Sequence, residues 1–207
     1  MTDPHAAPQS TEGAAYADRL ERLETVWWKR ALDVQRPYRW NLRRLDPGFT
    51  LDIGCGLGRN LSHLDGNGVG VDHNPDSVAI ARSRGLTVFT PDEFAASAYA
   101  VPGRFDSLLC AHVVEHMPTA DAVELLRPHL RWVRDGGKVI VITPQERGFR
   151  SDPTHVEFVD FDSLRAITQA LDLTWESGRS FPLPRAAGRA FTYNEFVVVA
   201  RTRSPAS

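Results

Sequence analysis

The chain has 207 residues, of which 42% are hydrophobic, so it can bury a full core and most simply forms one domain with short tails. A formal net charge of −2 provides no general field that would attract nucleic acid or an anionic membrane. No apolar run approaches the length needed to cross a bilayer, and the polar N-terminus lacks the apolar core of a signal peptide. The two cysteines, Cys55 and Cys110, fall in predicted core or ligand-loop positions, and we therefore expect a cytoplasmic protein with reduced thiols.

The N-terminal part of the chain precedes the predicted core. Residues 1–13 are rich in Pro, Ala, Ser and Thr, a composition that predicts a disordered tail. Residues 14–46 carry apolar positions at helical spacing, which predicts an amphipathic helix followed by a second helix over Tyr38–Leu45. The aromatic and arginine side chains of the second helix leave two roles open: a lid over a bound ligand, or ordinary packing with a solvated basic face.

Residues 47–203 form the predicted core domain, because Pro47-Gly48 ends the helices and residues 204–207 read as a loose tail. Short strands end at Ile53 and at Asp72, and strands and helices alternate through most of the remaining chain. The later elements are predicted as a helix over Pro75–Arg84, a strand over Leu86–Thr90, a turn at Asp92-Glu93-Phe94, a strand over Phe105–Ala111, a helix over Ala120–Val133, a strand over Lys138–Thr143, a helix over Phe161–Leu171, and strands over Leu173–Ser180 and Tyr193–Arg201. This alternation predicts a parallel sheet that is covered on both faces and binds ligands at the carboxyl ends of its strands.

The most informative stretch of the core begins with the strand Leu51–Ile53. Glycines at positions 54, 56 and 58 follow it and precede a helix-like segment. Glycine leaves no Cβ between the loop backbone and a ligand and permits positive φ, while the helix that follows offers unpaired N–H groups. The stretch therefore predicts the first strand, loop and helix of a nucleotide-binding α/β domain. A dinucleotide fingerprint would place another glycine where this chain has Arg59, which argues against a dehydrogenase.

A second short strand, Val69–Asp72, ends in a carboxylate. Asp72 could accept hydrogen bonds from both hydroxyls of a ribose. The alternative is that Asp72 only caps a helix that starts at Pro75. Since the carboxylate and the glycine loop occur together at this spacing, we favour the ribose role.

From about Leu51 to Pro144 the chain resembles class I S-adenosylmethionine-dependent methyltransferases, whose first motif is D-x-G-x-G-x-G. The resemblance implies a Rossmann-like α/β fold with a seven-stranded sheet, helices on both faces and a C-terminal antiparallel hairpin. It also implies that the cofactor S-adenosyl-L-methionine binds at Asp52, Gly54, Gly56, Gly58, Asp72, His73, Asp92 and Cys110. In that family the acidic residue after the second strand binds the ribose, and one after the third strand contacts the adenine. Asp92 is the candidate for the adenine contact, with helix capping as its alternative.

Three side chains that can bind a metal follow the fourth predicted strand: His112, Glu115 and His116. On a helical turn His112 would share a face with Glu115 or His116, and imidazole and carboxylate together can hold a divalent ion. The segment resembles the metal-binding E-x-x-E-H signature of ubiquinone-biosynthesis O-methyltransferases and of small-RNA terminal 2′-O-methyltransferases. His112 departs from it, because those families have a glutamate at that place.

The same resemblance supplies a fourth expected ligand, His155, from a segment that follows Thr143-Pro144. The expected ion is Mg²⁺ or Mn²⁺, which would acidify an acceptor hydroxyl and orient its neighbour. Two alternatives stay open: Glu115 and His116 only orient the loop, or His116 or His155 acts as a general base without metal. Glu115, His116 and His155 are thus the expected catalytic residues.

This chemistry favours O-methylation of a hydroxyl that has a neighbouring oxygen, as in a sugar or another polyol. The whole pattern also resembles small bacterial sugar O-methyltransferases, including those that act on methylated mannosides. We therefore expect a small-molecule acceptor, most simply a saccharide, with no membrane partner and no nucleic acid. An RNA-end 2′-O-methyltransferase and a non-catalytic cofactor-binding module are the alternatives.

Overall fold

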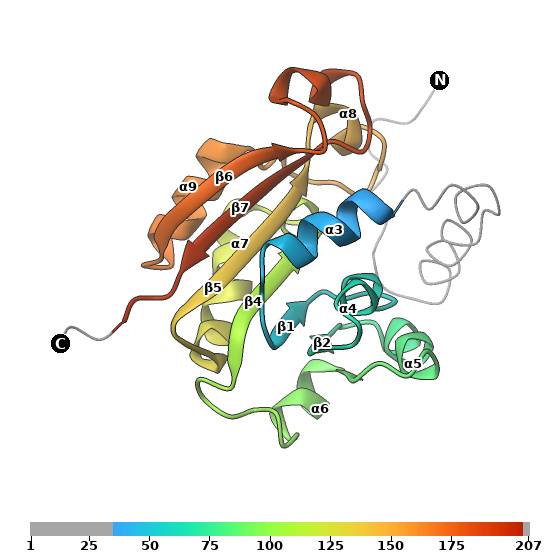
Figure 1. Cartoon of the computed structure of the whole chain (residues 1–207), viewed down its shortest axis with the longest axis vertical. Helices are drawn as coiled ribbons and strands as arrows, with labels where there is room; N and C mark the ends of the chain where they lie inside the picture. Colours follow the sequence, from blue (N-terminus) through green and yellow to red (C-terminus); the bar gives the residue numbers. More distant parts are fainter. Residues whose placement is uncertain (1–34, 205–207) are drawn as a thin grey trace.

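A computed structural model of the chain describes residues 35–204 (Figure 1). The tail predicted over residues 1–13, the first helix predicted within residues 14–46, and residues 205–207 lie outside the described residues. None of the helices within residues 35–204 combines the length and the apolar character that are needed to cross a membrane.

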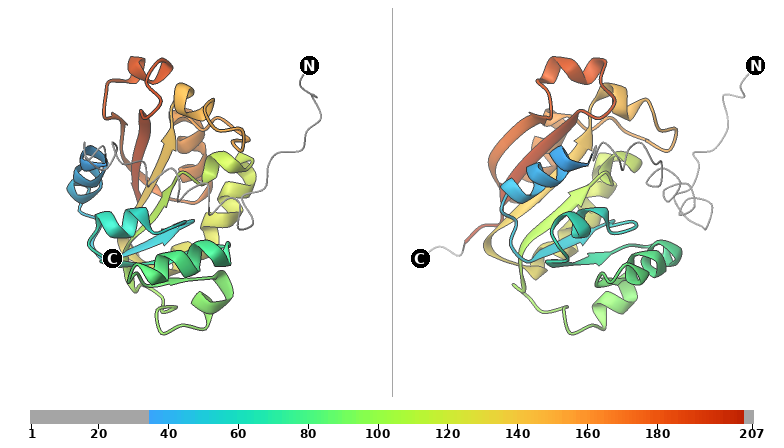
Figure 2. Two further views of the ribbon diagram at one scale, coloured as in Figure 1. Left: turned by 90° about the vertical axis from the view of Figure 1, so that its right-hand side faces the viewer. Right: turned by 45° about the vertical axis from the view of Figure 1, so that its right-hand side comes forward.

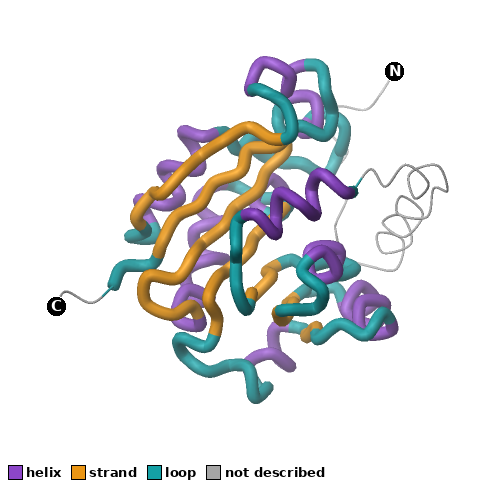
Figure 3. Tube along the Cα trace, in the orientation of Figure 1, coloured by secondary structure: helices purple, strands orange, loops and turns teal. Residues whose placement is uncertain are grey.

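A seven-stranded sheet with the order β3-β2-β1-β4-β5-β7-β6 forms the centre of the molecule (Figure 3). Its strands are β1 (Thr50–Ile53), β2 (Gly68–Val71), β3 (Val88–Phe89), β4 (Phe105–Ala111), β5 (Val133–Pro144), β6 (Thr174–Phe181) and β7 (Glu195–Arg201). The first five strands are parallel, and β7 runs antiparallel to both β5 and β6. This arrangement confirms the predicted Rossmann-like methyltransferase sheet with its C-terminal antiparallel strands.

Helices cover both faces of the sheet, with α3 on one face and α7 and α9 on the other (Figures 1 and 2). The helices are α3 (Arg36–Arg44), α4 (Arg59–His63), α5 (Pro75–Ser83), α6 (Pro91–Ala95), α7 (Thr119–Leu126), α8 (Glu146–Phe149) and α9 (Phe161–Ala170), with 3₁₀ helices η1 (Val114–His116), η2 (Arg127–Trp132) and η3 (Arg185–Arg189). The two faces are built by alternation along the strands. In β4, Leu108 packs in the cluster that contains Leu126 and Leu164, whereas Leu109 packs with Leu42 of α3.

The helix α3 is the described part of the predicted N-terminal helices. Leu42 is buried against the sheet, while Arg43 and Arg44 are exposed. The buried and exposed sides of α3 match ordinary packing with a solvated basic face. The predicted lid role of this helix, and of the N-terminal helices over residues 14–46 as a whole, stays a prediction.

Two predicted elements differ in kind from the observed ones, and others differ in their bounds: β5 begins at Val133 instead of Lys138, and β3 is limited to Val88–Phe89. The helix predicted over Ala120–Val133 ends as α7 at Leu126 and continues as the 3₁₀ helix η2, because Pro128 has no N–H to donate and its ring crowds the preceding turn. The predicted turn at residues 92–94 forms the helix α6 instead. Its N-cap is Thr90, which exchanges hydrogen bonds with Glu93 in a capping box. The alternative that Asp92 caps this helix is therefore wrong.

Candidate functional site

The loop after β1 has a backbone that requires glycine. Gly54, Gly56 and Gly58 have φ of 69°, 52° and 77°, in the left-handed region. A Cβ on Gly54 would lie 2.4 Å from the Val113 side chain, and one on Gly58 would lie 2.2 Å from Leu86. The positive φ therefore disfavours larger residues at all three positions, and the space left by Val113 and Leu86 is small at Gly54 and Gly58. The loop follows β1 directly at the carboxyl edge of the sheet.

Asp72, the residue after β2, holds this loop. Its Oδ2 accepts a hydrogen bond from the Gly56 N–H at 2.7 Å, and its Oδ1 accepts one from the Asn74 N–H at 2.9 Å. Each carboxylate oxygen has two lone pairs, so capacity to accept ribose hydroxyls remains. The structure therefore brings Asp72 and the glycine loop together. His73 lies beside them, with Nδ1 3.7 Å from Asp72 Oδ1 and half of its side chain exposed.

Asp52 lies within β1 and is fully buried. Burial raises its pKa to about 7, while the nearby Asn60 side chain and the charge of Arg59 offset part of the effect. Within residues 35–204 neither carboxylate oxygen of Asp52 accepts a hydrogen bond. Buried carboxylate oxygens are normally hydrogen-bonded, so this one is suited to receive donors from a ligand held at the glycine loop.

The raised pKa of Asp52 predicts a pH dependence of stability. The folded-state pKa of about 7 lies above the ordinary value of 3.8. The contribution of Asp52 to the free energy of unfolding is therefore fully present below about pH 4 and is lost as the pH rises through 7. The loss should reach on the order of 4 kcal/mol. Denaturant unfolding of the cofactor-free protein from pH 4 to 8, compared with Asp52→Asn, measures it. We expect the difference in the free energy of unfolding between wild type and Asp52→Asn to change with pH. A difference that is constant from pH 4 to 8 would contradict this assignment.

Two of the expected cofactor residues are placed differently. Asp92 lies exposed in the first turn of α6, and no hydrogen bond joins it to the glycine loop within residues 35–204. Cys110 is fully buried and packs on the same side of β4 as Leu108, so burial raises the pKa of its thiol. The Cys110 side chain therefore has no exposed surface for a ligand, and the expected cofactor contact is not formed by its thiol.

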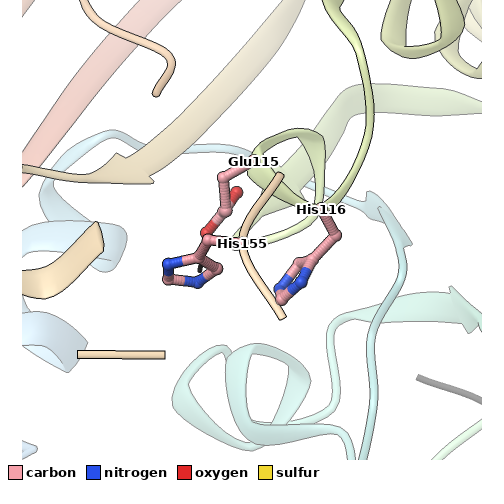
Figure 4. Close-up of side chains that lie close together, drawn as sticks. All are labelled: Glu115, His116 and His155. Atoms are coloured by element: carbon pink, nitrogen blue, oxygen red, sulfur yellow. Dashed lines mark ion pairs between the residues drawn. The ribbon is translucent and has the colours of Figure 1, made fainter. Parts of the chain in front are cut away.

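A group of three ligand-type side chains lies beyond the end of β4 (Figure 4). Glu115 and His116 come from η1, and His155 comes from the loop between α8 and α9. Each offers one ligand atom, and these atoms all lie within 4.8 Å of one another. The N–H groups of Val156 and Glu157 donate to the Glu115 carbonyl at 2.8 and 3.2 Å, which fastens the loop of His155 to η1.

Hydrogen bonds determine which nitrogen of each histidine faces this group. His155 Nδ1 lies 2.7 Å from the Phe149 carbonyl, which can only accept, so Nδ1 carries the proton. His155 Nε2 then presents its lone pair 3.9 Å from Glu115 Oε1. A main-chain carbonyl that fixes the tautomer in this way is the usual partner of a metal-binding histidine.

His116 has the same arrangement. Its Nδ1 lies 3.1 Å from both the carbonyl and the hydroxyl oxygen of Thr154, and that hydroxyl donates its own proton to Asp152 at 2.8 Å. His116 Nδ1 is therefore the donor, and Nε2 keeps its lone pair. Burial lowers the pKa of His116, which favours the neutral form that a ligand requires.

Glu115 is fully buried, and neither of its carboxylate oxygens accepts a hydrogen bond from residues 35–204, although its Oε1 lies 3.3 Å from His112 Nδ1 in an ion pair. Buried carboxylate oxygens that lack a hydrogen bond can still receive a further cation. Together with the two free Nε2 lone pairs, this donor set fits a divalent ion.

The structure does not bring His112 into the ligand group. Its Nε2 lies 2.9 Å from Glu195 Oε1 and its Nδ1 lies 3.3 Å from Glu115 Oε1. Burial by itself would lower the pKa of His112, but the two carboxylates raise it to about 9. Both ring nitrogens of His112 face a carboxylate oxygen, so in this arrangement His112 pairs with Glu195 and Glu115 and lies outside the ligand group. Glu195 escaped the sequence analysis because no local motif marks it.

A polar hollow of about 380 Å³ lies elsewhere, at the amino-terminal edge of the parallel strands. Its Lys138 is bonded to the carbonyls of Leu45 and Asp46, and its Arg134 is paired with Asp106. Because ligands of such sheets bind at the carboxyl edge, we place the functional site at the glycine loop and the ligand group.

The sequence profile of the methyltransferase domain family matches residues 51–141. This match covers less than half of the chain, and with the strand order of the sheet it gives the fold of S-adenosylmethionine-dependent methyltransferases. The matched region includes the glycine loop, Asp72 and the pair Glu115-His116. His155 and Glu195 lie beyond the matched region.

Known proteins similar to this chain include the ubiquinone biosynthesis O-methyltransferase of Xanthomonas oryzae pv. oryzae, 27% identical over 143 residues. The aligned part is 61% of this chain and 59% of that protein, so the chain spans less than two thirds of the length of this relative. A methyltransferase structure from Archaeoglobus fulgidus aligns with a TM-score of 0.59 and 21% identity over 81% of this chain and 94% of that one. Magnesium protoporphyrin IX methyltransferase from Synechocystis with bound SAH aligns with a TM-score of 0.63 and 16% identity over 91% and 95%. These structural likenesses establish the fold.

Proposed function

We propose that the protein is an S-adenosylmethionine-dependent O-methyltransferase that acts on a small-molecule hydroxyl with the help of Mg²⁺ or Mn²⁺. The observation that carries the proposal is the ligand group of Glu115, His116 and His155 at the carboxyl edge of a methyltransferase sheet. In it, two histidine lone pairs face a buried carboxylate that accepts no hydrogen bond from residues 35–204. The relative from Xanthomonas is named as an O-methyltransferase, which agrees with this chemistry.

The cofactor is proposed to bind at the glycine loop. The three glycines allow its close approach, Asp72 accepts the ribose hydroxyls, and Asp52 receives donors of its methionine part. Asp92, with His73 nearer the loop, is proposed to form the adenine side of the pocket.

Methyl transfer breaks the bond from carbon to the sulfonium sulfur and forms a bond from carbon to the acceptor oxygen, whose proton must leave. The chain's task is to align these three atoms and to favour the ionised hydroxyl. Glu115, His116 and His155 would hold the ion, which when bound lowers the pKa of the hydroxyl and orients a neighbouring oxygen. In the metal-free alternative, neutral His116 takes the proton itself.

The acceptor is proposed to be a saccharide or another polyol, with methylated mannosides as the first candidates, and the enzyme to work in the cytoplasm. Incubation with radiolabelled S-adenosylmethionine tests this on methyl mannoside, a catechol and a short RNA with a free terminal diol. We expect label on the saccharide and none on the RNA. Label on the catechol alone would overturn the saccharide proposal, and label on the RNA alone would replace it with terminal 2′-O-methylation.

A further inference from the structure

Glu195 reaches the candidate site because of the strand order. It is the first residue of β7, which is antiparallel to β5, and it lies opposite Pro144 at the end of β5. An antiparallel strand places its first residue at the edge where its parallel neighbours end. Glu195 therefore lies at the carboxyl edge of β4 and β5, where the ligand group is also found, although no motif of the methyltransferase domain contains it.

The geometry connects Glu195 to the proposed metal centre through one side chain. Its Oε1 contacts His112 Nε2 at 2.9 Å, and His112 Nδ1 lies 3.3 Å from Glu115 Oε1. One imidazole ring thus separates the two carboxylates. The Glu195 side chain keeps 12% of its surface exposed. Each carboxylate oxygen has two lone pairs, so the exposed part of Glu195 keeps capacity for a further donor.

Aromatic side chains belong to the segment that leads into Glu195. The Tyr193 ring is 55% exposed, and the Phe191 ring packs edge-on against it at a centroid distance of 5.8 Å. The Tyr38 hydroxyl donates to the Tyr193 carbonyl at 2.7 Å, which holds this segment against α3. An exposed ring two residues from an acceptor-only carboxylate suits a ligand that has both an apolar face and hydroxyl donors.

We propose that Glu195 binds a second hydroxyl of the acceptor, adjacent to the hydroxyl that is methylated, and that the Tyr193 ring forms the adjoining wall. The inference rests on the proposed O-methyltransferase function and assigns the acceptor to the polyhydroxylated class. A carboxylate accepts hydrogen bonds and repels phosphate, so Glu195 selects hydroxyl-rich molecules against nucleotide chains.

Glu195→Gln tests this assignment, because it keeps the volume and changes the chemistry on the acceptor side. The amide oxygen must face the His112 N–H, so the amide NH₂ faces the acceptor, where a hydrogen-bond acceptor stood before. Titration calorimetry of methyl mannoside into the protein loaded with S-adenosylhomocysteine should give about tenfold to hundredfold weaker binding. The affinity for S-adenosylhomocysteine itself should not change. Glu176→Gln, on the edge strand β6, is the matched control and should bind methyl mannoside normally.

Monodeoxy derivatives of methyl mannoside identify the hydroxyl that is bound. For wild-type protein, one of these deoxy sugars should bind about tenfold more weakly than methyl mannoside. For Glu195→Gln, the same deoxy sugar and methyl mannoside should bind equally, because the lost hydroxyl and Glu195 form a coupled pair. Unchanged binding of methyl mannoside by Glu195→Gln overturns the inference and leaves the O-methyltransferase function standing. Methylation of a catechol by a wild-type protein that binds no saccharide overturns the inference and the saccharide proposal, and methylation of RNA alone overturns the small-molecule function as well. If Glu195→Gln does not fold, Glu195→Asp replaces it in the experiment. This variant keeps the charge but shortens the side chain by one methylene, and it should no longer discriminate between methyl mannoside and its deoxy derivative.

Discussion

Removal of divalent ions with a chelator should abolish methyl transfer while the affinity for S-adenosylhomocysteine stays unchanged, and added Mg²⁺ or Mn²⁺ should restore the rate. The reason is geometric. The proposed metal ligands lie in η1 and in the loop of His155, whereas the cofactor loop is held by Asp72 from β2, so the two sites share no side chain. Turnover measured in chelator, followed by metal titration and by calorimetry with S-adenosylhomocysteine, checks both halves of the prediction.

Substitution of each proposed ligand shows how much that side chain contributes to metal binding. Glu115→Gln keeps the volume but removes the charge that offsets the ion, and His116→Ala removes a ligand outright. Both variants should need at least about tenfold more Mg²⁺ for half-maximal rate. His155→Ala tests the third ligand separately, because it belongs to a different segment of the chain. His129→Ala is the matched control: its Nδ1 also bonds a main-chain carbonyl, that of Leu125, but it lies in η2 outside the ligand group.

The metal proposal has a clear opposite outcome. Full activity in chelator, with His116→Ala still inactive, would identify His116 as the general base of a metal-free enzyme. Burial lowers the pKa of His116, so such a base would be neutral and competent at neutral pH.

The second large effect is expected at Asp72. S-Adenosylhomocysteine should raise the melting temperature of the wild-type protein and NAD should not, because only a ligand that binds the folded state stabilises it. At a hundredfold excess over the dissociation constant the gain is about 2.7 kcal/mol, or roughly 5–10 °C for a domain of this size. Asp72→Ala should remove most of the shift, since the ribose loses its acceptor and the Gly56 N–H loses its partner. Thermal melts with and without each ligand measure it.

Asp76→Ala is the control for this experiment. Asp76 is exposed in the first turn of α5, four residues from Asp72, and it makes no contact with the glycine loop within residues 35–204. This variant should lose some stability through the helix N-terminus and keep the whole ligand-dependent shift. A shift with NAD and none with S-adenosylhomocysteine would contradict the cofactor assignment altogether.

Local patterns in the sequence determined much of the fold. The stretch Phe105–Ala111 predicts β4 with the bounds that the structure shows, because burial on both faces leaves its second half, Leu108–Ala111, continuously apolar. The glycines after β1 predicted the loop, since their spacing reports a backbone conformation that only glycine adopts readily. Errors arose where one residue overrode the pattern, as Pro128 did by converting the end of a predicted helix into η2.

The candidate site itself depended on contacts between distant segments. The sequence named Glu115, His116 and His155 through resemblance, but only the folded chain shows the loop of His155 fastened to the Glu115 carbonyl. The role of His112 changed because β7 brings Glu195, 83 residues later, within 2.9 Å of it. A histidine beside one carboxylate can still bind a metal with its other nitrogen. A histidine between two carboxylates has both nitrogens paired and is held as a cation. The strand order decides which carboxylates come together at the site. Local sequence patterns do not reveal the strand order, because it depends on contacts between residues that are far apart in the chain.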